Sequence, residues 1–199
     1  MQLLIGHGQV PTIMPEASHL TAFFRKNMGW MVCLLDMKEF ENTELQSKIF
    51  IEDGAYHKLL SIIKESLRKV ETGGIIIGHY DSAFQNAIIT EFTGPPEDSK
   101  AGRFRFYRGI KGLRNLLQQY WKERNEYYLG EWHLHPGSSP NPSHTDIEQM
   151  KKISKDKNFN CKEPILLIFG EIAKKQVTCL MMFKDGKMYS YKEKDFERK

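Results

Sequence analysis

The sequence predicts a main domain of the α/β or α+β class, in which helices flank a mixed β-sheet. Runs of apolar residues, rich in β-branched side chains and bounded by glycine, proline and other turn residues, recur from residue 48 onward. Segments whose apolar residues recur at helical spacing lie between these runs. Helices interspersed among six or more strands favour a mixed sheet that is covered on its faces.

The first half of this domain begins with a strand at Ile49 to Ile51 and a helix. The apolar residues of that helix recur at Leu59, Leu60, Ile63, Leu67 and Val70. Buried central strands are expected at Ile75 to Ile77 and at residues 87–92. A turn-rich loop follows over residues 94–102, and Phe104 and Phe106 then alternate with arginines as in a half-buried strand.

The second half begins with a helix that has one apolar face, formed by Ile110, Leu113, Leu116, Leu117, Tyr120 and Trp121. A strand over residues 127–135 follows and is ended by Pro136. After Ser143 the spacing of Ile147, Met150 and Ile153 predicts another helix. Further strands are expected at residues 165–169 and 177–183, and an edge strand at residues 188–191.

The chain of 199 residues divides into a main domain at residues 46–191, an N-terminal extension at residues 1–45 and a charged C-terminal tail at residues 192–199. Within the extension, Leu20, Phe23, Phe24 and Trp30 suggest a short amphipathic helix, and Met31 to Leu35 could form a strand. The extension is expected to be a structural cap on the main domain, with a substrate-binding or autoinhibitory role as the alternative.

Composition excludes several classes of protein. With 40% hydrophobic and 27% charged residues, the chain reads as globular, without a membrane span or signal peptide. The net charge of +4 is small and its basic residues are dispersed, so nucleic-acid binding is not expected. Cys33, Cys161 and Cys179 are odd in number and far apart, which indicates free thiols in a reducing compartment, the cytoplasm.

One basic stretch stands out, formed by Arg103, Arg105, Arg108, Lys111 and Arg114. We expect it to form a solvated face, with contact to an acidic patch or to the tail of a modifier protein as the alternative.

A candidate metal site follows the strand at residues 127–135. His133 and His135 are separated by one residue, so on a strand both point to the same face and can share a metal ion. The helix that opens at Ser143 would return Asp146 toward the end of that strand. Three ligands that leave a fourth position to water are typical of catalytic zinc, and non-haem iron is the main competitor for two histidines and a carboxylate.

Each part of this constellation has a simpler interpretation. Ser-x-x-Asp before an apolar run is also a helix capping box, and two histidines on a strand are commonly ordinary residues. Neighbouring polar and aromatic side chains are expected not to bind the metal: His144 faces elsewhere on the helix, and His79, Glu131 and Trp132 are strand residues, with Trp132 in the core.

The full pattern, His-x-His-Pro followed by six residues and Ser-x-x-Asp, resembles the signature of the JAMM family, the zinc-dependent MPN-domain peptidases that remove ubiquitin and ubiquitin-like modifiers. The resemblance extends over about residues 48–191. Glu71, before the glycine-rich strand at residues 73–78, is similar to the family's general base. The resemblance implies an MPN/JAB-like layered fold similar to that of cytidine deaminases, and one Zn²⁺ per chain held by His133, His135 and Asp146. It also implies Ser143 as a stabiliser of the oxyanion.

Within this family the sequence is most similar to bacterial JAB peptidases of antiphage and ubiquitin-like conjugation operons. The resemblance implies hydrolysis of an isopeptide or peptide bond that joins a ubiquitin-like modifier, or a conjugated bacterial immune protein, to its target. E1-like or E2-like enzymes would be partners. The alternatives are a non-catalytic MPN-like scaffold and a JAB peptidase that processes a sulfur-carrier or modifier precursor. A zinc deaminase is disfavoured, because its Pro-Cys-x-x-Cys pair is absent.

Overall fold

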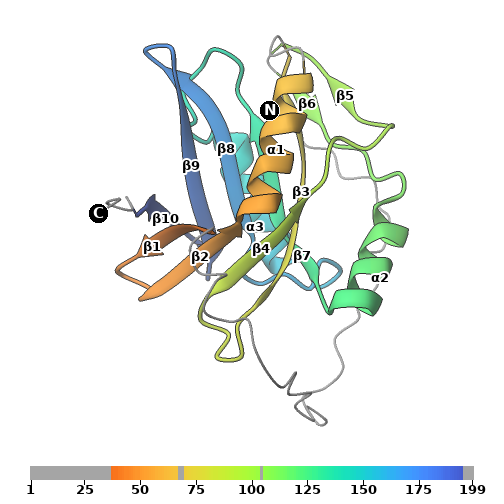
Figure 1. Ribbon diagram of the computed structural model, residues 1–199, viewed down its shortest axis with the longest axis vertical. Helices are drawn as coiled ribbons and strands as arrows, with labels where there is room; N and C mark the ends of the chain where they lie inside the picture. Colours follow the sequence, from red (N-terminus) through yellow and green to blue (C-terminus); the bar gives the residue numbers. More distant parts are fainter. Residues whose placement is uncertain (1–36, 67–69, 104, 195–199) are drawn as a thin grey trace.

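The computed structural model describes residues 37–66, 70–103 and 105–194, and these residues form a curved, mixed main sheet with helices on both sides and a small second sheet (Figure 1). The helices are α1 (Asp53–Glu65), α2 (Leu113–Arg124) and α3 (His144–Lys155). The strands are β1 (Met37–Asn42), β2 (Ser47–Glu52), β3 (Thr72–Tyr80), β4 (Ala87–Phe92), β5 (Lys100–Ala101), β6 (Phe106–Tyr107), β7 (Tyr127–Leu134), β8 (Ile165–Ile172), β9 (Lys175–Lys184) and β10 (Lys187–Glu193).

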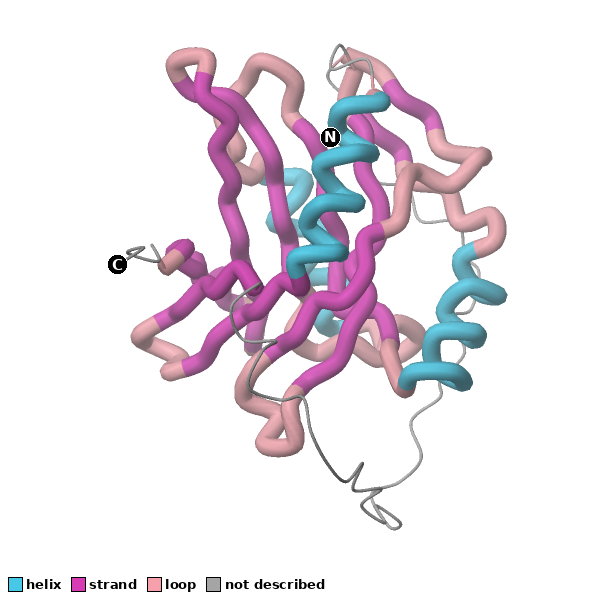
Figure 2. The backbone as a smooth tube through the Cα atoms, viewed as in Figure 1, coloured by secondary structure: helices cyan, strands magenta, loops and turns pink. Residues whose placement is uncertain are grey.

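Eight strands close into a barrel in the order β1-β10-β9-β8-β7-β3-β4-β2, and β5 and β6 form a separate two-stranded sheet (Figure 2). Most neighbouring strands run antiparallel, whereas β2 with β4 and β7 with β8 run parallel. The predicted mixed sheet flanked by helices is therefore confirmed. Closure into a barrel was not predicted, and the layered, cytidine-deaminase-like arrangement is not confirmed.

Two apolar cores lie on the two faces of the sheet. Because successive strand residues point to opposite faces, Ile76 packs in the core with α1, whereas Ile75 and Ile77 pack in the core with α2 and α3. Figure 1 shows α1 in front of the sheet and α3 behind it. The candidate ligands of β7 point to the side of α3, so the metal site lies between this helix and the sheet.

The first predicted helix is shorter than its apolar spacing suggested. Helix α1 ends at Glu65, where Ser66 turns extended and donates its backbone N–H to the Ile62 carbonyl. Leu67 lies outside the described residues, and Val70 is not helical. Glu71 is therefore not part of a helix: it directly precedes β3, and Gly73 lies within that strand.

The sequence predicted an edge strand at residues 188–191. Strand β10 is instead an interior strand, because it pairs with β9 on one side and with β1 on the other. Strand β1 comes from the segment that was expected to be an extension. Its residues 37–42 belong to the sheet, whereas the expected elements at Leu20 to Leu35 lie outside the described residues. The charged C-terminal tail was expected to begin at residue 192, but Lys192 and Glu193 belong to β10.

Other expectations have mixed outcomes. The half-buried strand expected around Phe104 and Phe106 is reduced to the two residues of β6, and Phe104 lies outside the described residues. Ile110 precedes α2 and is exposed. Cys161 and Cys179 are free thiols as predicted, and Cys33 falls in the part that the structure does not describe. Among the described helices, none has the length and apolar character that crossing a bilayer requires.

Candidate metal centre

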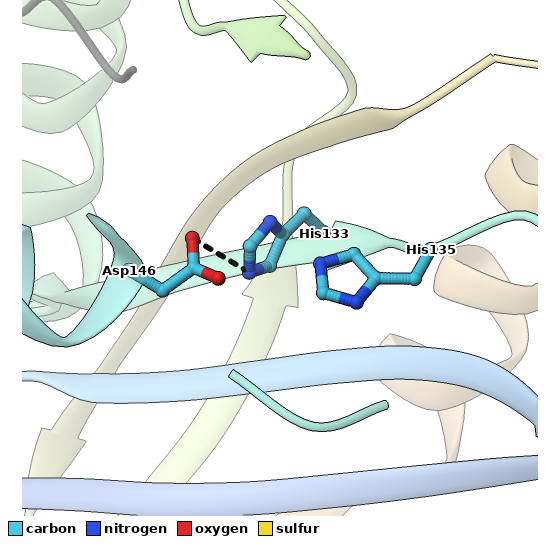
Figure 3. A group of neighbouring side chains, drawn as sticks. All are labelled: His133, His135 and Asp146. Carbon is cyan, nitrogen blue, oxygen red and sulfur yellow. Dashed lines mark ion pairs between the residues drawn. The ribbon is translucent and has the colours of Figure 1, made fainter. Parts of the chain in front are cut away.

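The two histidines stand where β7 ends between β3 and β8. His133 lies on β7 opposite Gly73 of β3 and Ile168 of β8. His135 follows one residue after the strand, which ends at Leu134 rather than at His135 as predicted. Its backbone N–H still donates to the Phe169 carbonyl at 2.7 Å, so the pairing with β8 continues. The two imidazole rings therefore remain on one side, with centroids 4.9 Å apart (Figure 3).

Asp146 reaches this strand from the first turn of α3, and the capping box holds it there. The Ser143 N–H donates to Oδ2 of Asp146 at 2.7 Å, and the Asp146 N–H donates to Oγ of Ser143 at 3.2 Å. The other oxygen, Oδ1, faces His133 with 3.9 Å to Nε2. The capping interpretation and the ligand interpretation are thus compatible, since the cap uses one carboxylate oxygen and leaves the other facing the histidines.

The loop between the histidines and α3 is fixed to β8. The Glu171 N–H donates to the Ser138 carbonyl at 2.7 Å, and the Ser139 carbonyl lies 3.2 Å from Nδ1 of His135. If Nδ1 carries the proton, this contact leaves Nε2 of His135 as the lone-pair donor to a metal, the arrangement common in metal-binding histidines. Gly137 has φ of +60°, a conformation that glycine adopts without strain.

The donor set fits a divalent metal ion. One nitrogen each of His133 and His135 and one oxygen of Asp146 lie within 4.8 Å of one another, and this is the only such group among the described residues. Nε2 of His133 and Oδ1 of Asp146 are buried and have no hydrogen-bond partner in the part of the chain that the structure describes. Buried polar atoms are rarely left unpaired, so two that face each other are well explained by an ion between them.

Glu71 lies beside this group at the start of β3. Its neighbour Thr72 pairs with Leu134, and its backbone N–H donates to the Gly102 carbonyl at 2.9 Å. Oε2 of Glu71 is buried without a hydrogen-bond partner among the described residues. Burial raises the pKa of the Glu71 carboxyl above its ordinary value, while the nearby His135 opposes that rise. A raised pKa brings the carboxylate closer to the proton affinity that a general base needs near neutral pH.

Burial also shapes the ligands. It lowers the pKa of His133 to about 3, with the adjacent His135 acting in the same direction. The imidazole thus stays neutral, the form that binds a metal. Burial raises the pKa of Asp146, whereas the hydrogen bonds from Ser143 counteract this rise.

In the metal-free protein we expect the free energy of unfolding to decrease as the pH falls below about 6.5. The unfolded chain protonates His133 near that pH, whereas the folded chain keeps it neutral down to about pH 3. Over this window the residue costs up to about 1.4 kcal/mol of stability per pH unit. Urea unfolding at pH 7, 6 and 5 should give a steeper loss for the wild type than for His133→Gln. Equal slopes would contradict this assignment.

The other polar residues near the site are placed as follows. His144 is exposed on α3, and His79 lies at the far end of β3, so neither joins the ligand group. Trp132 is buried in the core with α1, as predicted, and its Nε1 donates to the Thr93 carbonyl. The expected solvated face is wrong for Arg108, which is buried in an ion pair with Glu131. A glutamate in the middle of a largely apolar strand was the signal that a buried partner exists.

In this mixed sheet, β7 pairs in parallel with β8 and ends at two histidines. A carboxylate from the start of α3 meets them there, and the three side chains define a domain with a candidate mononuclear metal centre. The family model described as "Prokaryotic homologs of the JAB domain" matches residues 57–182, more than half of the chain. The chain belongs to this family of prokaryotic JAB-domain proteins.

The chain is also similar to named proteins and to a solved structure. A protein of Enterobacter hormaechei subsp. hoffmannii named "CD-NTase/cGAS isopeptidase" is 38% identical over 147 residues, which cover 69% of this chain and 81% of that protein. An Escherichia coli protein of the same name is 30% identical over 113 residues, 50% of this chain and 70% of that protein. Among solved structures, the solution structure of a Desulfitobacterium hafniense protein has a TM-score of 0.48 and 17% identity, covering 73% of this chain and 88% of that one.

Proposed function

We propose that the protein is a zinc-dependent isopeptidase, with His133, His135 and Asp146 as ligands of one Zn²⁺. The observation that carries this proposal is the convergence of unpaired buried donor atoms from β7 and α3, with the unpaired Oε2 of Glu71 beside them. Two histidines and one carboxylate can bind either zinc or iron, and we favour zinc because a hydrolysis needs no redox-active metal. The family supports the hydrolytic class of reaction, and the names of the two relatives support an isopeptide bond as the bond that is cleaved.

The residues of this chain divide the chemistry between them. When bound, zinc would supply a water of lowered pKa and polarise the carbonyl of the scissile bond. Glu71 accepts the proton of the attacking water and passes it to the departing amine, which a carboxylate of raised pKa does more readily.

Ser143 is placed to stabilise the oxyanion. Its Oγ accepts the hydrogen bond from the Asp146 N–H, so the hydroxyl proton is free to be donated to the developing negative charge. The first turn of α3 adds the positive end of its helix dipole in the same place.

For the substrate we propose a conjugate in which a nucleotidyltransferase of the CD-NTase/cGAS type is joined through an isopeptide bond. The relatives' names are the support for this choice. Removal of such a link would return the free amine of the target and the carboxylate of its conjugated partner. The E1-like and E2-like enzymes that would form the conjugate, and the cytoplasm as the compartment, stay predictions.

The test combines metal analysis with cleavage of defined substrates. Purified protein is expected to hold close to one zinc per chain and to cleave an isopeptide-linked CD-NTase conjugate faster than a linear fusion of the same two proteins. Chelation should abolish cleavage, and added zinc should restore it. A zinc-loaded protein that cleaves neither substrate would indicate a scaffold, and one that cleaves only the linear fusion would indicate precursor processing; each result overturns the proposal.

A further inference from the structure

A buried ion pair joins β7 to the segment between β4 and α2, residues 93–112. Arg108 donates to Glu131 through two nitrogens, from Nε to Oε2 at 3.1 Å and from Nη2 to Oε1 at 2.7 Å. The Tyr128 hydroxyl donates to the same Oε1 at 3.1 Å. The side chains of Arg108 and Glu131 are only 3% and 5% exposed. A two-point bond of this kind fixes the orientation of the arginine as well as its position.

Glu131, the acidic member of this pair, lies on β7, the strand that also carries His133. Glu131 precedes His133 by two residues, so their side chains leave β7 on the same face. Arg108 also donates from Nη1 to the carbonyl of Gly109 at 3.1 Å, which ties the guanidinium to its own backbone. The ion pair thus holds the β4–α2 segment in a fixed position relative to β7, the strand that carries His133.

The β4–α2 segment contacts the site in two places. The Gly102 carbonyl accepts the hydrogen bond from the N–H of Glu71. Phe106 is buried over β3, since a Cβ built on Gly73 would lie 3.1 Å from Cε1 of Phe106 and 3.0 Å from Cβ of His133. The segment therefore contacts Glu71, the proposed general base, and also β3 where it pairs with β7 at His133.

Other bonds of this segment brace it internally or at its start. The Gly109 N–H donates to Ser99 Oγ and the Ile110 N–H to Asp98, each at 3.0 Å. At the start, the Trp132 indole donates to the Thr93 carbonyl at 2.8 Å. The two-point bond from Arg108 to Glu131, here called the Arg108 fork, attaches the end of this unit nearest α2 to β7.

We propose that Arg108 and Glu131 are positioning residues for the hydrolysis, acting through Gly102 and Phe106 on the placement of Glu71 and on the cover over His133. This inference rests on the proposed function. Buried ion pairs add little net stability compared with apolar residues of similar size, so this pair is better explained by the geometry that it imposes. Misplacement of a catalytic group by about 1 Å costs on the order of 100-fold in rate.

The test replaces the whole polar cluster with apolar residues, so that no buried charge or hydroxyl is left unpaired. In the triple variant Arg108→Met/Glu131→Leu/Tyr128→Phe we expect one zinc per chain and a melting temperature near that of the wild type. We expect kcat to fall by on the order of 10- to 100-fold with KM little changed. Hydrogen exchange should accelerate at the amide of Glu71. Arg108→Lys, which keeps the charge but loses the fork, should give an intermediate kcat.

The matched control is Lys111→Met, which removes an exposed ion pair with Glu97 from the same segment and should leave kcat and exchange unchanged. A folded, zinc-loaded triple variant with wild-type kcat and wild-type exchange overturns the inference. If that variant does not fold, wild-type kcat and exchange in Arg108→Lys overturn it instead. A zinc-loaded wild type without cleavage is a failure of the proposed function alone, because the exchange at Glu71 still tests the positioning.

Discussion

Replacement of Glu71 by glutamine is expected to reduce the rate of isopeptide cleavage by about 10³-fold and to leave the zinc content at one per chain. Glutamine has the size and shape of glutamate, but its amide cannot take a proton from water at neutral pH. The Oε2 of Glu71 makes no hydrogen bond within the described chain, so an amide nitrogen in its place breaks none there. Cleavage under single-turnover conditions, together with metal analysis, measures the effect.

Glu126→Gln is the matched control for this substitution. Like that of Glu71, the Oε2 of Glu126 is buried and lacks a hydrogen-bond partner among the described residues. Glu126 precedes β7 at the end far from His133. The control should therefore cleave at the wild-type rate. A Glu71→Gln protein that stays within a few-fold of the wild type would remove Glu71 from the mechanism.

Replacement of Asp146 by asparagine is expected to abolish zinc-dependent cleavage while α3 stays capped. An asparagine side-chain oxygen can still accept the hydrogen bond from the Ser143 N–H, as Oδ2 does now. The amide group that then faces His133 is neutral and offers the metal no negative charge. Zinc should therefore no longer raise the melting temperature of the variant. In the wild type, free zinc at 1,000 times its dissociation constant would raise the free energy of unfolding by about 4 kcal/mol.

Thermal unfolding with and without zinc measures this effect, and Asp156→Asn serves as the control. Asp156 caps the other end of α3 and accepts a hydrogen bond from the Asn158 N–H at 2.9 Å. The control should keep the full zinc shift. If Asp146→Asn also kept it, Asp146 would be a helix cap alone.

The elements near the site could be predicted from the sequence because their signals are local. Alternation and apolar runs give β3, β4 and β7, and the Ser143 box gives the start of α3. The end of α1 was misplaced, because Val70 continues the helical spacing although the chain has already left the helix after Glu65. Spacing reports which residues share a face, and it does not report where the backbone turns.

The long-range features could not be predicted. Closure of the barrel depends on the pairing of β1 with β10, strands that lie more than 140 residues apart, and no local pattern encodes such a contact. The Arg108 fork was missed for a similar reason. A basic stretch is usually solvated, and only the tertiary contact with Glu131 shows that one member turns inward.

The closure of the barrel has a consequence for any shortened form of this protein. The family match at residues 57–182 omits β1, β2 and β10, which together join β4 to β9 around the barrel. Without them the exposed backbone N–H and C=O groups of β4 and β9 become sheet edges, which recruit strands from other molecules. A chain trimmed to the homologous core would thus keep every proposed ligand and yet tend to aggregate or to exchange strands between copies.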